Sequence, residues 1–277
     1  MSHFAFKQLD VFSSEPLKGN PLAVVLGADS LSDEQMAGFA RWTNLSETTF
    51  LLEPTTPEAD YRVRIFTTER ELPFAGHPTL GTCHAWLEAG GKPRGEVIVQ
   101  ECGVGLVRIR RGGQRLAFAA PPLLRHGEVE PELVERIARG LGIAQEAIVA
   151  SQWVDNGPGW VAVMLNDRAG VLALKPDYVT LAGLKLGVVA PWRTAGDADF
   201  EVRAFIAGDG MVEDPVTGSL NASLAQWMIG SGMAQARYIA SQGTALGRLG
   251  RVHVEQIGDD IWVGGATTTC IDGTLLL

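Results

Sequence analysis

Apolar residues recur at helical spacing in one stretch of the chain, Glu213 to Met228 (EDPVTGSLNASLAQWM). Leu220, Leu224 and Trp227 fall on one face of a helix, and the residues from Asp214 to Ser219 are typical of a polar loop that precedes it. The first turn of such a helix has unpaired backbone N–H groups at the positive end of the helix dipole. This stretch is therefore a candidate anion site, although many helices that begin this way are only capped.

The same pattern occurs twice in the chain. Residues 59–66 read ADYRVRIF and residues 198–205 read ADFEVRAF, and both alternate between apolar and polar positions as half-buried strands do. A polar Gly/Pro loop, a helix with a Trp near its end and then glycines follow each strand, over 71–91 and 213–232. Such a duplication predicts two similar domains whose polar loops face one another, with a site between them. The alternative is a chance similarity between two amphipathic strands.

Strands outnumber helices in the predicted elements of both halves. They do not alternate with helices as in a parallel α/β sheet, so we expect an α+β fold in which each half is a strongly curved sheet around a central helix. Residues 121–131 (PPLLRHGEVEP) are the best candidate for a linker. We therefore expect an N-terminal domain over 1–120, with the C-terminal strand as a candidate to complete it, and a C-terminal domain over 121–277.

The composition excludes several classes of function. A net charge of −9 argues against nucleic acid or an anionic membrane as a partner. No apolar run is long enough to span a membrane, and the first residues lack the pattern of a secretory signal, so we expect a cytoplasmic protein. Cys83, Cys102 and Cys270 show no C-x-x-C spacing, which predicts neither a disulfide framework nor a zinc site. The common nucleotide-binding, zinc-protease and serine-hydrolase motifs are also missing from the sequence.

Glu47 is a candidate general base. It directly precedes an apolar, β-branched run, Thr48–Leu52, which predicts a buried strand and places the carboxylate at the edge of a core. Partial burial raises the pKa of a carboxyl group towards the range that is useful for proton transfer. The alternative is that Glu47 is simply solvated, as most glutamates are.

The two polar loops supply further candidates for acid–base chemistry. His77 lies in the first loop, ahead of a helix predicted over about 79–88, and can exchange a proton near neutral pH. A histidine in a loop is more often merely exposed or a cap. Asp214 occupies the second loop. Donors to an anionic group are the backbone and hydroxyl groups of Gly76, Gly218 and Ser219.

Five motifs occur in order along the chain: GNPLAVV, ARWTNLSETTFLL, RIFT followed by ELPFAGHPTLG, GDGMVEDPVTGSLNASLAQW, and SQGTALGRLGRVHV. Together they resemble the PhzF family, the phenazine-biosynthesis-like proteins, over essentially the whole chain. The resemblance implies a diaminopimelate epimerase-like fold, with two pseudo-symmetric domains that are each a barrel-like sheet around a central helix. It also implies an active site in the cleft between the domains and a homodimer.

By the same resemblance, Glu47 is the proton shuttle. In the phenazine enzyme of the family, this Glu removes a proton from one ring carbon of trans-2,3-dihydro-3-hydroxyanthranilate and returns it to another carbon, without a metal or coenzyme. His77 and Asp214 fall on residues that line the substrate. The residues that hold the substrate's carboxylate and polar groups fall on Gly76, Gly218 and Ser219.

Two departures qualify the resemblance. The family's second loop usually continues T-G-S-A, whereas this chain has Leu220 after Ser219. Thiol-dependent racemases of the same fold need a Cys in each facing loop, and neither loop of this sequence has one. We therefore expect a cofactor-independent isomerase that acts on a small carboxylate substrate and binds no metal. An amino-acid epimerase or racemase of the same fold, and a non-catalytic small-molecule binding protein, remain alternatives.

Overall fold

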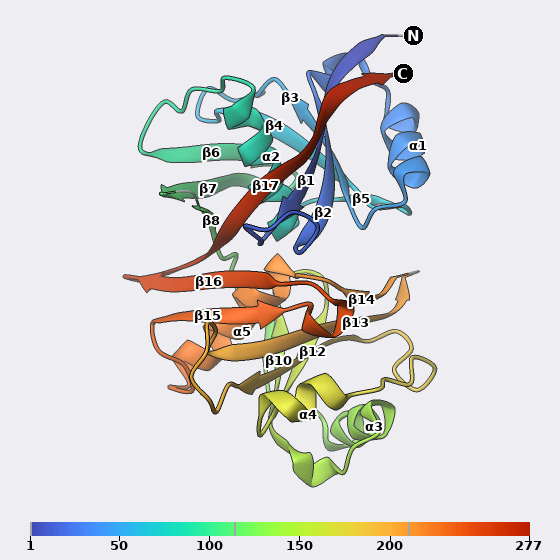
Figure 1. Ribbon diagram of the computed structural model, residues 1–277, viewed down its shortest axis with the longest axis vertical. Helices are drawn as coiled ribbons and strands as arrows, with labels where there is room; N and C mark the ends of the chain where they lie inside the picture. The colour runs from blue at the N-terminus through green and yellow to red at the C-terminus, as the bar shows by residue number, and fades with distance from the viewer. Residues whose placement is uncertain (1, 114, 210) are drawn as a thin grey trace. The chain divides into compact units, whose positions relative to one another are not determined.

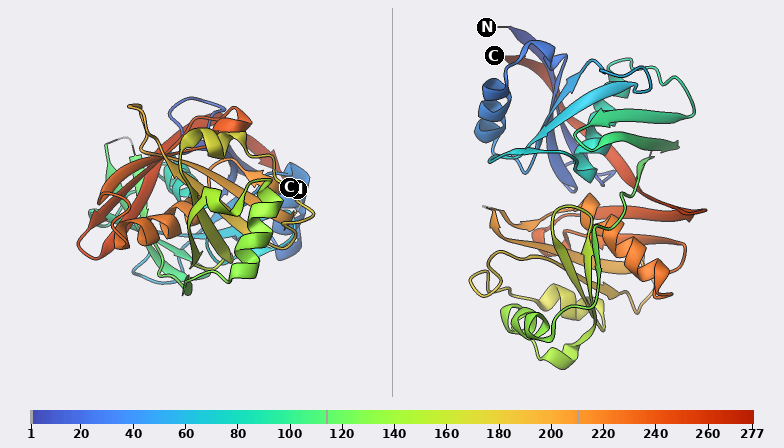
Figure 2. Two further views of the ribbon diagram at one scale, coloured as in Figure 1. Left: turned by 90° about the horizontal axis from the view of Figure 1, so that it is seen from below. Right: turned by 180° about the vertical axis from the view of Figure 1, so that it is seen from behind.

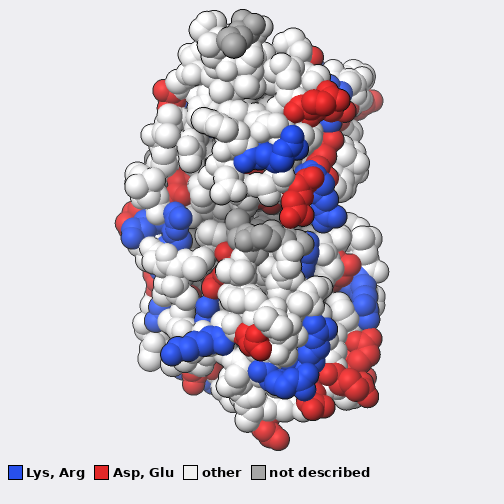
Figure 3. All heavy atoms as spheres, turned by 90° about the vertical axis from the view of Figure 1, so that its right-hand side faces the viewer, with Lys and Arg blue, Asp and Glu red and all other residues white. Residues whose placement is uncertain are grey.

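The computed structural model describes residues 2–113, 115–209 and 211–277. The chain folds into two compact units (Figure 1). Unit 1 consists of Met1–Ala119 with Gly264–Leu277, and unit 2 consists of Ala120–Val263. Within the described residues, no helix is both long and apolar enough to cross a membrane. On the face drawn in Figure 3, Lys and Arg side chains lie among Asp and Glu side chains, so the net charge of −9 does not form a single acidic patch there.

The wall of unit 1 is a closed ring of strands. The ring runs β1, β2, β3, β4, β6, β7, β8, β17 and back to β1, and β5 adds to the end of β4. Most neighbours are antiparallel, but β2 with β3 and β4 with β6 are parallel. The strands are β1 (His3–Val11), β2 (Asn20–Leu26), β3 (Thr48–Leu52), β4 (Tyr61–Phe66), β5 (Glu71–Leu72), β6 (Val97–Cys102), β7 (Gly105–Gly112), β8 (Arg115–Ala119) and β17 (Asp260–Leu276).

Two helices cover opposite faces of the unit 1 sheet. Helix α2 (Gly76–Glu88) is buried on nearly every side, as a helix enclosed by a sheet must be. At Gly81 the sheet comes so close that an added Cβ would overlap the Leu22 side chain of β2. Helix α1 (Asp33–Thr43) stands outside the ring, where Met36 and Phe39 pack on the outward side chains of β3 and β4 (Figures 1 and 2).

Unit 2 repeats this plan. Its strands follow the order β9, β10, β11, β12, β13, β15, β16, with β14 on β13, and a hydrogen bond of 2.8 Å from the Ala120 N–H to the Ile261 carbonyl joins the segment before β9 to β17. The pairs β11 with β12 and β13 with β15 are parallel. The strands are β9 (Arg125–Gly127), β10 (Ile148–Asp155), β11 (Trp160–Leu165), β12 (Lys185–Pro191), β13 (Phe200–Asp209), β14 (Met211–Asp214), β15 (Arg237–Gln242) and β16 (Gly250–Ile257).

Helix α5 (Gly218–Gly230) takes the inner position in unit 2 (Figure 2). A Cβ at Gly187 of β12 would overlap the side chain of Leu220, so this helix also packs directly on the strands. Helices α3 (Pro131–Leu141) and α4 (Arg168–Ala173) cover the other face, where Ile137 and Val171 join an apolar core with Phe205. Short 3-10 turns lie at Ala28–Ser30, Gln145–Ala147 and Thr244–Leu246.

The repeated strand sequence makes the same contacts in both units. The Asp60 carboxylate accepts a hydrogen bond of 2.8 Å from the N–H of Val99, which lies in the parallel strand β6. The Asp199 carboxylate accepts one of 2.7 Å from the N–H of Ile239, which lies in the parallel strand β15. In the opposite direction, the Asp60 N–H donates to the Val99 carbonyl at 2.7 Å, and the Asp199 N–H donates to the Ile239 carbonyl at 2.8 Å. The Asp of the repeat therefore fixes the parallel pairing that encloses each central helix.

The equivalent arginines of the two repeated strands also form equivalent ion pairs. Arg64 holds Glu71 through two hydrogen bonds of 2.7 Å, and Arg203 holds Glu213 through two of 2.8 Å. Each pair ties the repeated strand to the short strand that leads to the central helix. The segment before each central helix is thus held by an equivalent arginine–glutamate ion pair.

We expect Gly264→Ala to destabilise the fold, because the added Cβ would overlap the Leu116 carbonyl oxygen and push β17 away from β8. Overpacking against a fixed backbone costs about 1–3 kcal/mol in the free energy of unfolding. Gly273→Ala is the matched control, since it lies on the same strand with nothing within 4 Å of the added Cβ. Urea unfolding followed by circular dichroism would measure both, and equal stabilities would contradict the close approach.

Candidate active site

The parallel pairing of β2 and β3 gathers one group of polar residues in unit 1. Because these strands run in the same direction, their first residues lie at the same end of the ring. Asn20 begins β2, and Glu47 directly precedes β3. Helix α2 starts at this end as well, and Thr82 binds it to β3 through a hydrogen bond of 2.8 Å to Thr49. The packing of α2 therefore brings its first turn towards Glu47.

Glu47 and His77 meet at this end of unit 1. The distance from His77 Nε2 to Glu47 Oε2 is 3.5 Å, and the side chains are only 4% and 16% exposed for His77 and Glu47, respectively. The other ring nitrogen, Nδ1, lies 3.3 Å from the amide nitrogen of Asn20, which is fully buried. A shielded carboxylate beside an imidazole places two groups that can accept or donate a proton next to each other.

His77 was expected in a loop, but it lies in helix α2. Helix α2 begins at Gly76, three residues earlier than predicted, so His77 is the second residue of the helix and Gly76 the first. Pro78 is compatible with this early start because a proline in the first turn gives up an N–H that the helix does not use. The helix rather than a loop thus sets the direction of the imidazole.

Asp214 lies in a buried polar network at the start of α5 in unit 2. Its Oδ2 accepts a hydrogen bond of 2.6 Å from the Thr217 hydroxyl. Gln242, at the end of β15, donates to the Asp214 carbonyl and the Thr217 hydroxyl, and accepts from the Thr217 N–H and the Asn221 amide. Four hydrogen bonds of one fully buried side chain therefore hold the loop between β14 and α5.

Ser219 is the second residue of α5, as His77 is of α2, and Gly218 is the first. The Trp160 indole N–H donates to the Ser219 hydroxyl oxygen at 3.0 Å, and the Asn156 amide donates to the Ser219 carbonyl at 3.0 Å. The N-cap residues Ala75 of α2 and Thr217 of α5 make no side-chain cap hydrogen bond. The backbone N–H groups of these turns are suited to an anionic ligand.

The structure thus brings the six predicted residues together in two groups of three, one in each unit. Unit 1 holds Glu47, Gly76 and His77. Unit 2 holds Asp214, Gly218 and Ser219. That both groups serve one site stays a prediction.

Three residues of these groups were missed by the sequence analysis: Asn20, Trp160 and Gln242. Asn20 and Gln242 lie in the motifs GNPLAVV and SQGTALGRLGRVHV, which carry the family resemblance, but nothing in the motifs says what these side chains contact. Trp160 gave no signal beyond an apolar strand. Only the pairing of the strands with each central helix assigns them to the candidate site.

The cysteines do not form a two-thiol site. Cys83 is buried inside α2, where burial raises the pKa of its thiol to about 12. Burial also raises the pKa of the Cys102 thiol, while Cys270 is exposed. All three are free, and across residues 2–113, 115–209 and 211–277 no three His, Cys, Asp or Glu side chains gather as metal ligands would.

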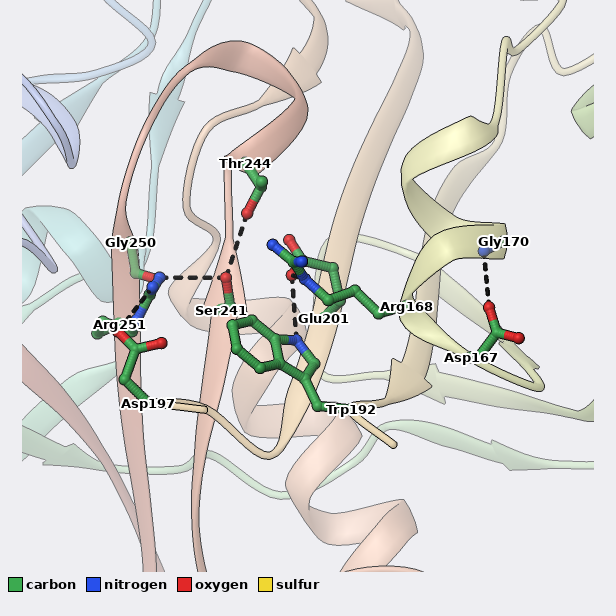
Figure 4. Close-up of polar contacts among 10 residues, drawn as sticks. All are labelled: Asp167, Arg168, Gly170, Trp192, Asp197, Glu201, Ser241, Thr244, Gly250 and Arg251. Carbon is green, nitrogen blue, oxygen red and sulfur yellow. Dashed lines mark hydrogen bonds and ion pairs between the residues drawn. The ribbon is translucent and has the colours of Figure 1, made fainter. Parts of the chain in front are cut away.

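A second polar cluster lies on the other face of the unit 2 sheet (Figure 4). The buried carboxylate of Glu201 accepts from Arg168 Nε at 2.9 Å and from the Trp192 indole at 3.1 Å. Arg251 joins Asp197 to the Ser241 hydroxyl in the same region. Since alternate residues of β13 face α5, this cluster lies away from the start of that helix and instead holds α4 and the segment before β13 against the sheet.

One pocket of about 370 Å³ lies outside the candidate groups. It is formed where α1 ends against β1 and β17, and its lining includes Trp42 and Leu275. It contains none of the six predicted residues. Its walls belong to the outer face of the unit 1 sheet, whereas Glu47 lies beside the inner helix.

The sequence matches a family described as phenazine biosynthesis-like protein (PhzC-PhzF) over residues 9–273. The chain belongs to this family. Antisense-enhancing sequence 1 of Schizosaccharomyces pombe is 38% identical over 99% of both chains. The trans-2,3-dihydro-3-hydroxyanthranilate isomerase of Pseudomonas aeruginosa is 37% identical over 220 residues, which are 78% of this chain and 77% of that enzyme.

A solved structure extends the similarity to the fold. The crystal structure of a PhzF family protein from Enterococcus faecalis matches with a TM-score of 0.82 and 26% identity, over 100% of both chains. The predicted PhzF family and the α+β epimerase-like fold are therefore confirmed. Together with the isomerase names among its relatives, membership of the PhzF family supports the prediction of an isomerase.

We expect Gln242→Glu to destabilise this PhzF family protein. The substitution removes two donors and sets a carboxyl oxygen against the Asp214 carbonyl and the Thr217 hydroxyl, at a cost of about 2–4 kcal/mol in the free energy of unfolding at pH 8. Burial raises the folded-state pKa of the new carboxyl above its unfolded value, so the deficit is smallest at acid pH and grows as the pH rises. Urea unfolding at several pH values would measure it. Gln256→Glu, exposed on β16, is the control and should change little.

We expect alkylation at pH 8 to modify Cys270 and leave Cys83 intact. A thiol with a pKa of about 12 is ionised in only about one molecule in 10,000 at that pH, and Cys83 is also shielded. Peptide mass spectrometry after iodoacetamide treatment would locate the label, with Cys270→Ser as the control that loses it. Loss of activity that follows labelling of Cys83 would instead indicate a catalytic thiol.

Proposed function

We propose that this protein is a cofactor-independent isomerase that moves a proton between two carbons of a small carboxylate substrate, with Glu47 as the base and then the acid. The observation that carries the proposal is the contact between the shielded carboxylate of Glu47 and the imidazole of His77, at 3.5 Å. Catalysis by a single base that returns the proton it removed requires a carboxylate that is held in place and kept from bulk water. The burial of this pair supports that role.

The proposed step is balanced without an oxidant or reductant. The Glu47 carboxylate takes a proton from one carbon, and the electron pair of the broken C–H bond moves into the adjacent conjugated system of the substrate. A new C–H bond then forms at a second carbon as Glu47 returns the proton. Glu47 ends in the ionised form in which it began, with Nε2 of His77 3.5 Å from its Oε2.

The start of α5 supports the choice of a carboxylate substrate. The hydroxyl of Ser219 and the uncapped first turn from Gly218 offer hydrogen-bond donors, and the positive end of the helix dipole favours a negative group. We propose that these groups bind the substrate carboxylate, Gly76 offers the corresponding N–H of α2, and Asp214 binds a polar group of the substrate. The substrate of the Pseudomonas aeruginosa relative, trans-2,3-dihydro-3-hydroxyanthranilate, is the first compound to test.

We also propose a homodimer, as the family resemblance implies. Sedimentation equilibrium of the purified protein would measure the mass directly. A mass that stays at that of one 277-residue chain over a wide concentration range would exclude it.

Glu47→Gln is expected to reduce kcat about 100-fold to 10,000-fold, because it removes the acid–base group while keeping the shape of the side chain. The unmodified protein should convert the substrate into its isomer, and in heavy water any exchange of the Glu47-bound proton before its return should appear as deuterium on the product. The variant should show neither. Mass spectrometry of trans-2,3-dihydro-3-hydroxyanthranilate and of a panel of amino and hydroxy acids would detect the exchange.

Glu69→Gln is the matched control, since Glu69 is exposed in unit 1 and the substitution should leave turnover unchanged. Full turnover in Glu47→Gln would exclude the proposed shuttle. Tight binding of a test compound without turnover in the unmodified protein would favour the non-catalytic binding protein instead.

A further inference from the structure

In each unit, the second residue of the central helix contacts the first residue of a strand, and the two strands, β2 and β11, hold equivalent places in the two units. Asn20 begins β2 and contacts His77, whereas Trp160 begins β11 and contacts Ser219. Both strands are followed in the ring by a parallel neighbour, β3 or β12. An asparagine and a tryptophan share no sequence signal, but the duplicated fold gives them the same place.

Asn20 determines which nitrogen of His77 carries the proton. An amide nitrogen can only donate, so the His77 Nδ1 that lies 3.3 Å from it must act as an acceptor. The proton of the neutral ring is then on Nε2, the nitrogen that lies 3.5 Å from Glu47. The Ser46 hydroxyl lies 3.5 Å from the Asn20 amide oxygen and can donate to it in this orientation of the amide.

Trp160 has the corresponding effect on Ser219. An indole N–H can only donate, so the Ser219 hydroxyl oxygen accepts this bond and its own hydrogen is available to another acceptor. Trp160 is 2% exposed and cannot turn away without disturbing the core. The pair leaves Ser219 as a donor, which suits the recognition of a carboxylate.

We propose that Asn20 and Trp160 are positioning residues that fix the direction of hydrogen bonding at the start of α2 and α5. Asn20 presents the Nε2–H of His77 to Glu47, and Trp160 presents the hydroxyl hydrogen of Ser219 to the substrate carboxylate. The catalytic consequence rests on the proposed function. The tautomer of His77 is a property of the protein alone and can be measured without a substrate.

The first experiment is an ¹⁵N NMR measurement of the imidazole nitrogens in the whole labelled protein, assigned through His77→Gln. The unmodified protein should show Nδ1 without and Nε2 with a proton. Asn20→Asp replaces the donor by an acceptor of the same shape, so Nδ1 should become protonated. Asn166→Asp adds the same charge at an exposed turn of unit 2 and should leave the His77 signals unchanged.

A protonated Nδ1 in the unmodified protein at pH 8 would overturn the inference for Asn20, whatever the protein catalyses. A failure of the proposed function would appear differently. The tautomer would be as described, but no compound would be isomerised or would exchange deuterium.

The second experiment tests Trp160 with trans-2,3-dihydro-3-hydroxyanthranilate as the substrate. Trp160→Phe keeps the aromatic packing and removes the donor, so KM should rise about fivefold to tenfold, as expected for the loss of one oriented hydrogen bond, with a smaller change in kcat. The increase should disappear when Ser219 is already alanine, because both substitutions remove the same interaction. Trp42→Phe, which changes an exposed indole of α1, is the control.

Independent, additive effects of Trp160→Phe and Ser219→Ala would overturn the role of Trp160. Circular dichroism and urea unfolding of each variant would separate a loss of folding from a loss of positioning. An unchanged KM in Ser219→Ala would also overturn the role of Trp160, since it would show that the Ser219 hydroxyl does not donate to the substrate.

Discussion

The enclosure of a helix by a curved sheet is the constraint on which each unit depends. Such a helix is buried all round, and its first backbone N–H groups have no partners within the helix. The N-cap residues of α2 and α5 make no side-chain cap hydrogen bond. The polar side chains of the candidate site stand at these two helix starts, supplied by the ends of neighbouring strands. The fold therefore gathers polar side chains at the start of each central helix.

The two units contain equivalent arginine–glutamate ion pairs, which contribute differently to stability. Arg64 and Glu71 are partly exposed, with side-chain exposures of 24% and 42%, so the pair contributes about 0–1 kcal/mol to stability. The equivalent pair of Arg203 and Glu213 is only 7% and 6% exposed, and loss of one partner there costs about 3–5 kcal/mol. The same ion pair is therefore a surface interaction in unit 1 and a buried one in unit 2.

The residues at the starts of the two central helices differ between the units more than the residues that hold the helices in place. Gln100 of unit 1 donates to Thr79 of α2, and Gln242 of unit 2 contacts Asn221 of α5, so a buried glutamine holds each central helix. At the second helix position, however, unit 1 has the imidazole of His77 and unit 2 the hydroxyl of Ser219. The two helix starts thus carry different chemical groups, a titratable ring in unit 1 and a hydroxyl in unit 2.

The sequence alone predicted most of the strands, the central helices, the repeat and the family, because these depend on periodicity, turn residues and ordered motifs that are local in the chain. It also placed Glu47 at the start of a buried strand. It did not predict β9, which lies in the segment expected to be a linker. It could not determine that α2 begins at Gly76, since propensity leaves helix ends uncertain. Nor could it assign Asn20 and Trp160 to His77 and Ser219, which lie 57 and 59 residues away. Only the parallel pairing of strands around an enclosed helix brings those side chains within hydrogen-bonding distance.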